Sequence, residues 1–121
     1  MKINYINENS NNLAICITIP KTIKWEDYQK ELDAVADGKQ EMNFKVAQLP
    51  TKVKVGDRCY LCYNNQIIGW MRISYLGPKN FDSTVGNKHW EGLFISRTGP
   101  LNKLKYPIPC KGFRGYKYIN F

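Results

Sequence analysis

Two short segments of alternating polar and apolar residues, separated by only two asparagines, constrain the fold of this chain more than any other feature. The first runs from Arg58 to Tyr63 and the second from Gln66 to Leu76, with Asn64-Asn65 between them. Period-two alternation is typical of a half-buried β-strand, and asparagine tolerates the backbone conformations of a tight two-residue turn. The sequence therefore predicts an antiparallel β-hairpin over residues 58–76.

The rest of the chain predicts further strands and one helix. Leu13–Ile19 is rich in β-branched residues and suits a buried strand that ends at Pro20. In Trp25–Ala36 apolar residues recur every three or four positions, which predicts an amphipathic helix that ends at Gly38. The remaining expectations are a short strand or a linker over residues 39–50, a polar loop over 77–87, a strand over 90–97 that Gly99-Pro100 ends, and a C-terminal strand.

These elements fit one small domain. A length of 121 residues without a break in composition predicts a single domain over residues 1–121. Five or six strands with one main helix place the chain in the α+β class, as a small, strongly bent mixed β-sheet or pseudo-barrel. Hydrophobic residues make up 43% of the chain, which is enough for an ordinary core without help from metals or disulfides.

The predicted hairpin also carries a family resemblance. Val53–Tyr63, which opens the strand with Val-Gly-Asp, and the following Gln66–Ile73, with Ile-Ile-Gly, resemble the hairpin of PUA-like domains, the superfamily that contains PUA, ASCH and EVE modules. The resemblance implies a small mixed β-barrel with one or two helices and a cleft that holds RNA or a modified base. The Gly-x-Lys-x-x-Glu-x-Arg signature of ASCH domains is not present. The nearest stretch, Ile19–Lys24, keeps the cations without the glutamate and arginine, so no subfamily is assigned.

Charge is distributed unevenly along the chain, and this distribution indicates the kind of partner that the protein binds. Of the formal net charge of +8, residues 1–50 contribute −1 and residues 51–121 contribute +9, and no acidic residue follows Glu91. Such asymmetry favours an anionic partner over a basic surface kept for solubility. We expect a non-catalytic binding module for RNA, DNA or a modified base. The alternative is a protein that sequesters or senses a small nucleotide, which would show a shallower loss of affinity with salt.

The C-terminal segment mixes the residue types that such binding uses. In residues 111–118 arginine and lysine can contact phosphates, phenylalanine and tyrosine offer stacking faces, and two glycines let the backbone bend or approach a ligand. The same stretch also suits a glycine-bent closing strand with core aromatics. The predicted ligand-binding residues are Trp70, Trp90, Arg97, Lys103, Lys105, Lys111, Gly112, Phe113, Arg114 and Tyr116.

Signatures of catalysis, metals and cofactors are weak. Cys59-x-x-Cys62 lies within a strand, where residues three apart point to opposite faces, so the pair is a poor metal site, and we expect no metal or cofactor. Neither a Walker A motif nor a Gly-x-Gly-x-x-Gly motif is present. Glu91 is a lone carboxylate among cations, and a small amidohydrolase-type enzyme using Glu91 and a lysine remains an alternative to the binding module.

The expected location is the cytoplasm. The longest apolar runs are far below the roughly 20 residues that cross a bilayer, so no membrane association is predicted. The N-terminus lacks the apolar segment and cleavage site of a secretory signal. We therefore expect the cysteines to be reduced and buried as small hydrophobic residues.

Overall fold

The computed structural model describes residues 13–38, 40–83 and 88–120, which form one helix and six strands. The helix α1 spans Trp25–Ala36. The strands are β1 (Leu13–Thr18), β2 (Met42–Val46), β3 (Arg58–Tyr63), β4 (Gln66–Ser83), β5 (Lys88–Pro109) and β6 (Tyr116–Asn120). The helix has the bounds that its periodicity predicts, and the ambiguous segment 39–50 contains a strand.

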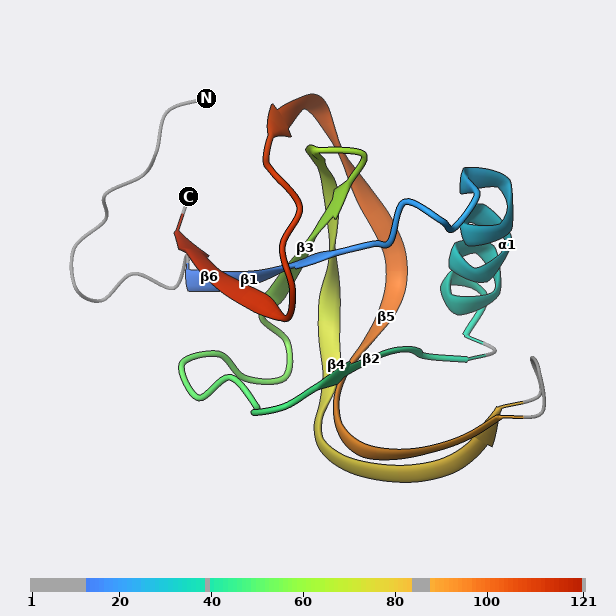
Figure 1. The fold of residues 1–121 in the computed structure, drawn as a ribbon. Coiled ribbons are helices and arrows are strands. Elements are labelled where there is room, and N and C mark those ends of the chain that lie inside the picture. The colour runs from blue at the N-terminus through green and yellow to red at the C-terminus, as the bar shows by residue number, and fades with distance from the viewer. Residues whose placement is uncertain (1–12, 39, 84–87, 121) are drawn as a thin grey trace.

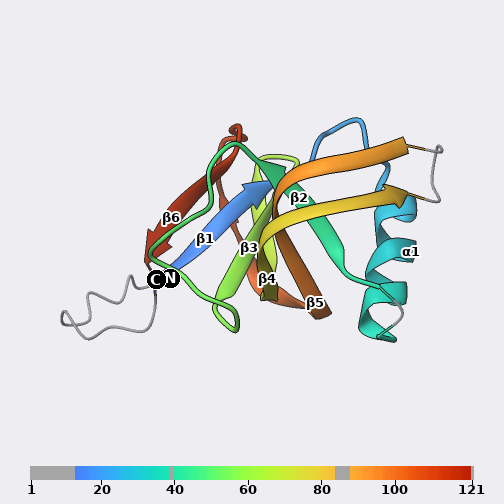
Figure 2. The same ribbon diagram turned by 90° about the horizontal axis from the view of Figure 1, so that it is seen from below.

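All six strands belong to one sheet in the order β2-β5-β4-β3-β1-β6. β1 runs parallel to β3, because the chain passes through α1 and β2 between them, and every other neighbouring pair is antiparallel. This mixed sheet curls into a half-barrel with α1 at one side (Figures 1 and 2). The prediction of a small, strongly bent mixed sheet with one main helix is confirmed, although the helical part of the α+β class rests on α1 alone.

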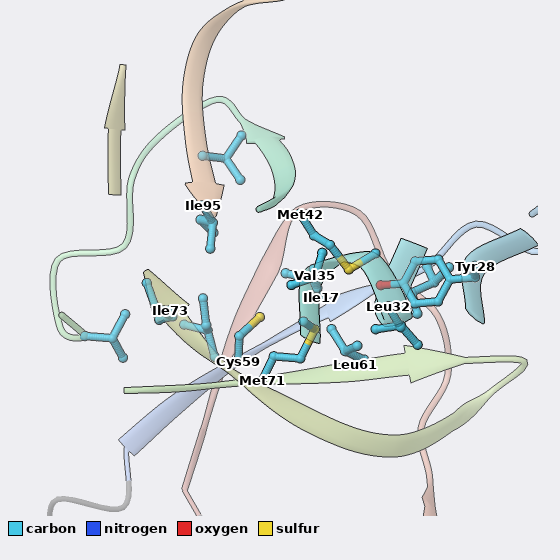
Figure 3. Packing of buried hydrophobic residues seen from close by; sticks show 14 residues of the cluster. Ile17, Tyr28, Leu32, Val35, Met42, Cys59, Leu61, Met71, Ile73 and Ile95 are labelled. Atoms are coloured by element: carbon cyan, nitrogen blue, oxygen red, sulfur yellow. The ribbon is translucent and has the colours of Figure 1, made fainter. Parts of the chain in front are cut away.

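The inner face of the sheet, defined as the face that packs toward α1, holds the larger hydrophobic core. Figure 3 shows side chains of α1 meeting those of the strands in this cluster. α1 contributes Tyr28, Leu32 and Val35, the buried residues of its apolar stripe. The strands and their flanking segments contribute Ile15, Ile17, Ile19, Met42, Val46, Val53, Cys59, Leu61, Met71, Ile73 and Ile95.

Local signals account for the ends of α1. Glu26 and Asp27 lie in its first turn, where carboxylates interact favourably with the helix dipole. Gly38 adopts φ 76° and donates its N–H to the Val35 carbonyl at 3.0 Å, as a residue that terminates a helix does. Within residues 13–38, 40–83 and 88–120, no helix is long and apolar enough to cross a membrane.

The hairpin predicted from Asn64-Asn65 is confirmed. Both asparagines have positive φ, 53° and 62°, which matches the two-residue turn that joins tightly paired antiparallel strands. Arg58 pairs with Arg72 and Tyr60 with Trp70 across β3 and β4. This register fixes which side chains share each face of the hairpin.

The loop expected over residues 77–87 and the strand end expected at Gly99-Pro100 are both wrong for the described residues. β4 continues through Pro78 to Ser83 and pairs with β5, which itself continues through Pro100 to Pro109. β3 pairs with β4 only as far as Arg72, so within the described chain the side of β4 away from β5 has no neighbouring strand at Pro78 that needs its missing N–H. Residues 84–87 lie outside the described structure. The far ends of β4 and β5, residues 78–83 and 88–93, curve away from the rest of the sheet toward the side of α1 (Figures 1 and 2). We call this two-stranded extension the arm.

Candidate functional site

The outer face of the sheet, opposite α1, combines a small apolar cluster with cations and aromatic rings. Its buried members come from β1, β3 and β4 and are Ala14, Cys16, Tyr60, Cys62 and Ile67. Half-buried residues, which include Trp70 and Phe113, pack against them. Side chains on this face follow the strand register, because directly paired residues project to the same side of a sheet.

One row of this register crosses four strands. Lys117 of β6 pairs with Cys16 of β1, which pairs with Tyr60 of β3, and Tyr60 pairs with Trp70 of β4. The next row places Arg58 of β3 directly opposite Arg72 of β4. The two rows bring three cations and two aromatic rings from β3, β4 and β6 to one surface.

Trp70 is the centre of the exposed part of this surface. The guanidinium carbon of Arg58 lies 3.9 Å from the ring centroid of Trp70, and that of Arg72 lies 4.8 Å from it. Both distances are within the range of a cation–π interaction. Arg58 also donates to the Tyr60 hydroxyl at 3.1 Å, and Arg72 to the Gly56 carbonyl at 3.0 Å. These contacts hold two positive groups against one indole ring.

No carboxylate neutralises this pair. The ion pairs among the described residues are Lys54–Asp57, Lys79–Glu41 and, when His89 is protonated, His89–Asp82. Within that part of the chain, neither Arg58 nor Arg72 forms an ion pair. Like charges directly opposite each other on neighbouring strands are mutually destabilising. An anion bound between the two guanidinium groups would relieve that repulsion.

The segment between β5 and β6 flanks this surface and is fixed by Thr18. The Thr18 hydroxyl accepts the backbone N–H of Phe113 at 3.1 Å, and a Cβ on Gly112 would lie 3.3 Å from the Thr18 methyl group. Lys117 sits 4.6 Å from the ring centroid of Phe113. Phe113 and Lys117 therefore form a second cation and aromatic pair, on the same outer cluster that Trp70 packs against.

The predicted ligand-binding residues divide between this surface and other places. Trp70 and Phe113 lie on the outer face, and Lys111, Gly112 and Arg114 are exposed in the segment around Phe113. The other five lie elsewhere. Trp90 lies on the arm beside Phe94 and Lys88, and Tyr116 packs against Tyr118 and the inner cluster. Lys103 lies over Trp25, Lys105 lies over Tyr106, and Arg97 is buried.

Sequence reasoning missed Arg58, Arg72 and Lys117 as members of the site. The signal for the two arginines was present, because Arg58 and Tyr60 alternate on one strand and Trp70 and Arg72 on the other. Once the Asn64-Asn65 turn sets the register, these four residues must share a face. The charge count along the chain had instead drawn attention to the region after Glu91.

Glu91, the candidate catalytic residue, lies apart from this surface. It lines a shallow hollow on the arm with Pro78, Lys79, Asn80, Gly92 and Leu93. Lys79 is the lysine of that hollow, but its ammonium group is held by Glu41 at 2.8 Å and by Asn43 at 2.9 Å. The lysine that lines this hollow is therefore occupied by other partners.

The four cysteines occur as free thiols in two separate environments. Cys59 lies in the inner cluster and Cys62 in the outer one, so the expectation that this pair points to opposite faces is confirmed. Burial raises the pKa of both thiols to about 11. Burial also raises the pKa of Cys16. All three therefore carry their protons at neutral pH.

Comparison with protein-family models, with curated proteins and with solved structures finds no match to this chain. The resemblance of the hairpin to PUA-like domains thus stays a prediction. The assignment of a function rests on the geometry of the outer face.

Proposed function

We propose that the chain is a non-catalytic binding module for a nucleic-acid-like anion, and that the ligand lies on the outer face around Trp70. The observation that carries this proposal is the arrangement of Arg58 and Arg72, which pair directly across two strands, both lie over one indole ring and have no carboxylate partner among the residues that the structure describes. A nucleotide supplies the two groups that would complete this arrangement, an anion and a flat ring that can stack. Its phosphate lies between the cations, and its base stacks near the aromatic side chains.

An extended strand of RNA or DNA fits this surface better than an isolated nucleotide. Cations occur at Arg58 and Arg72 on the central strands and at Lys117 on β6, and Lys111 and Arg114 follow in the exposed flanking segment. Proteins that bind single strands combine such a basic track with aromatic stacking platforms on a sheet. Trp70 and Phe113 supply two platforms along this track.

The salt dependence of binding tests the proposal. Polarisation of a fluorescent single-stranded RNA is measured against salt for the wild type and for R58Q/R72Q. If each arginine contacts a phosphate, the log–log slope becomes shallower by about 1.4, because each contact to a single strand contributes about 0.7. The matched control is K21Q/K30Q, which removes two exposed charges before and within α1 and should keep the wild-type slope.

Trp70 gives a second readout of the same site. W70A should lose about 1–3 kcal/mol of binding free energy, the range for base–aromatic stacking. The control is W90A, because Trp90 lies on the arm beside Lys88 and outside the proposed surface. Equal losses in W70A and W90A, or a slope in R58Q/R72Q equal to that of the wild type, would remove the outer face from the proposal. A shallow slope in the wild type itself would favour a single nucleotide as the ligand.

A further inference from the structure

Arg97 lies in the core of the half-barrel rather than on its surface. It pairs with Met42 of β2 and Ile73 of β4, two members of the inner cluster, and its side chain is only 4% exposed. Tyr28 of α1 is also 4% exposed, and Figure 3 shows its hydroxyl pointing into the inner cluster. The arginine is therefore enclosed between the sheet and the helix.

Three polar atoms of this pair lack a full hydrogen bond within the described residues. Nε and Nη1 of Arg97 and the hydroxyl of Tyr28 are fully buried, and none has a hydrogen-bond partner among the described residues. Burial raises the pKa of the Tyr28 hydroxyl, and the nearby Arg97 guanidinium partly opposes that shift through its charge and a side-chain contact. This contact lies outside the distance and angle of a full hydrogen bond. Buried polar groups are nearly always hydrogen-bonded, so three orphaned atoms at one place require an explanation.

The neighbours of Arg97 do not balance its charge. Burial raises the pKa of Cys59 to about 11, although Arg97 opposes the shift, and burial likewise raises the pKa of Tyr28. Both groups are neutral at pH 7. Glu31, whose charge also acts on Tyr28, is exposed on α1 and forms no ion pair with Arg97 within the described chain. An arginine keeps its charge in proteins, so a lone positive charge remains in the core.

We propose that this position is a second binding site, in which Arg97 and the Tyr28 hydroxyl hold the oxyanion of a small molecule. An isolated buried cation is strongly unfavourable, and a bound oxyanion supplies both the missing charge and the missing hydrogen-bond acceptors. The site is independent of the outer face, because Arg97 projects to the opposite side of the sheet from Trp70.

Enclosure limits the ligand to a small molecule and requires a movement of α1. A polymer cannot wrap around an arginine that is only 4% exposed, whereas a carboxylate or a phosphate group can enter when the helix opens locally. α1 packs mainly on β5 and β2, and no hydrogen bond or ion pair within the described residues joins its side chains to the sheet. Apolar contacts, with one cation–π contact between Lys103 of β5 and Trp25, thus hold the helix over the site.

Nuclear magnetic resonance tests the site in the unmodified protein. The ¹H–¹⁵N signal of the Arg97 Nε–H group is assigned by its absence in R97K and followed during titration with phosphate or acetate, at ionic strength held constant with chloride. We expect a saturable shift with at least one of the two anions. The anion that binds more tightly identifies the chemistry of the ligand as a phosphate or a carboxylate. A signal that neither anion moves overturns the proposal.

Thermal unfolding gives an independent test with a matched pair of variants. At about a hundredfold excess over Kd, the effective anion should raise the Tm of the wild type by about 5 °C or more. R97M should lose this rise, whereas K21M, which also replaces a cation by methionine but at an exposed position outside both proposed sites, should keep it. An equal rise in R97M and the wild type contradicts the proposal. If R97M does not fold, the titration of the wild-type Nε–H signal decides.

Discussion

The outer and inner faces of the sheet both carry arginines that have no carboxylate partner within the described part of the chain, but the two faces differ in access to water. Arg58 and Arg72 are exposed on the outer face, while Arg97 is 4% exposed on the inner one. Water screens the exposed pair, so a missing counter-ion there costs little. Burial removes that screening, and the missing counter-ion of Arg97 becomes a large unfavourable contribution to folding.

The same absence therefore has a different meaning on each face. On the outer face the informative feature is arrangement, because two cations meet over Trp70 where a random basic surface would spread them apart. On the inner face the informative feature is the free-energy cost of burying an unpaired charge. An apolar residue in place of Arg97 would avoid this cost, so we infer that the charge has a use. The two inferences are thus separate and can fail separately.

The largest difference that we expect between the two faces is in the free energy of unfolding lost when a packed leucine is shortened. L61A removes a fully buried leucine of the inner cluster and should lower the free energy of unfolding by about 2–5 kcal/mol. L104A makes the same change at a half-buried residue that packs on the outer cluster, where solvent can fill the space, and should cost less. Chemical denaturation measures both values. Equal losses would show that the outer face is as closely packed as the inner one.

The hairpin was predictable because its signals are local. The alternation of residues 58–63 and 66–76, the Asn64-Asn65 turn and the stripe of α1 each specify an element within a short window. The arm was not predictable in the same way. Pro78 and Pro100 are typical of strand ends, and Pro78 is acceptable only because, among the described residues, β4 has no neighbouring strand there on the side away from β5.

The candidate site was predictable in its chemistry but only partly in its position. Counting charge along the chain treats Arg97 like Lys105, although one lies in the core and the other is exposed. Sequence distance also hides that Lys117 and Trp70 belong to one row across β6, β1, β3 and β4. Long-range pairing, which the local pattern does not specify, decides which cations and rings meet.

We expect an effect of intermediate size on the free energy of unfolding in alkaline solution. The pKa values of Cys59, on the inner face, and Cys62, on the outer face, are both raised from 9.0 to about 11 by burial. Unfolded thiols lose their protons near pH 9 while the folded ones keep them, so stability is complete below pH 9 and falls as the pH rises toward 11. A full shift of two units corresponds to about 3 kcal/mol per thiol.

Single substitutions assign this loss to the two faces. C59A and C62A should each make the decline in the free energy of unfolding between pH 8 and pH 10.5 shallower than in the wild type, measured by denaturant titration under reducing conditions. Both cysteines are 0% exposed and both thiols have a pKa of about 11, so C59A and C62A should have similar effects. A decline that is unchanged in both variants would assign the alkaline loss to other groups.

The smallest effect should distinguish the two classes of arginine most directly. R72Q removes one of two like charges that face each other across β3 and β4, so at low salt it should raise the free energy of unfolding by a few tenths of a kcal/mol. R72K keeps the charge and should show no gain, and the difference between the two variants should vanish at high salt, because exposed charges are screened. The hydrogen bond from Arg72 to the Gly56 carbonyl opposes the gain, since R72Q removes it, but an exposed bond of this kind contributes little. A loss of more than about 1 kcal/mol in R72Q would show that Arg72 mainly anchors the turn at Gly56, and the repulsion on which the ligand site is argued would then be too weak to matter.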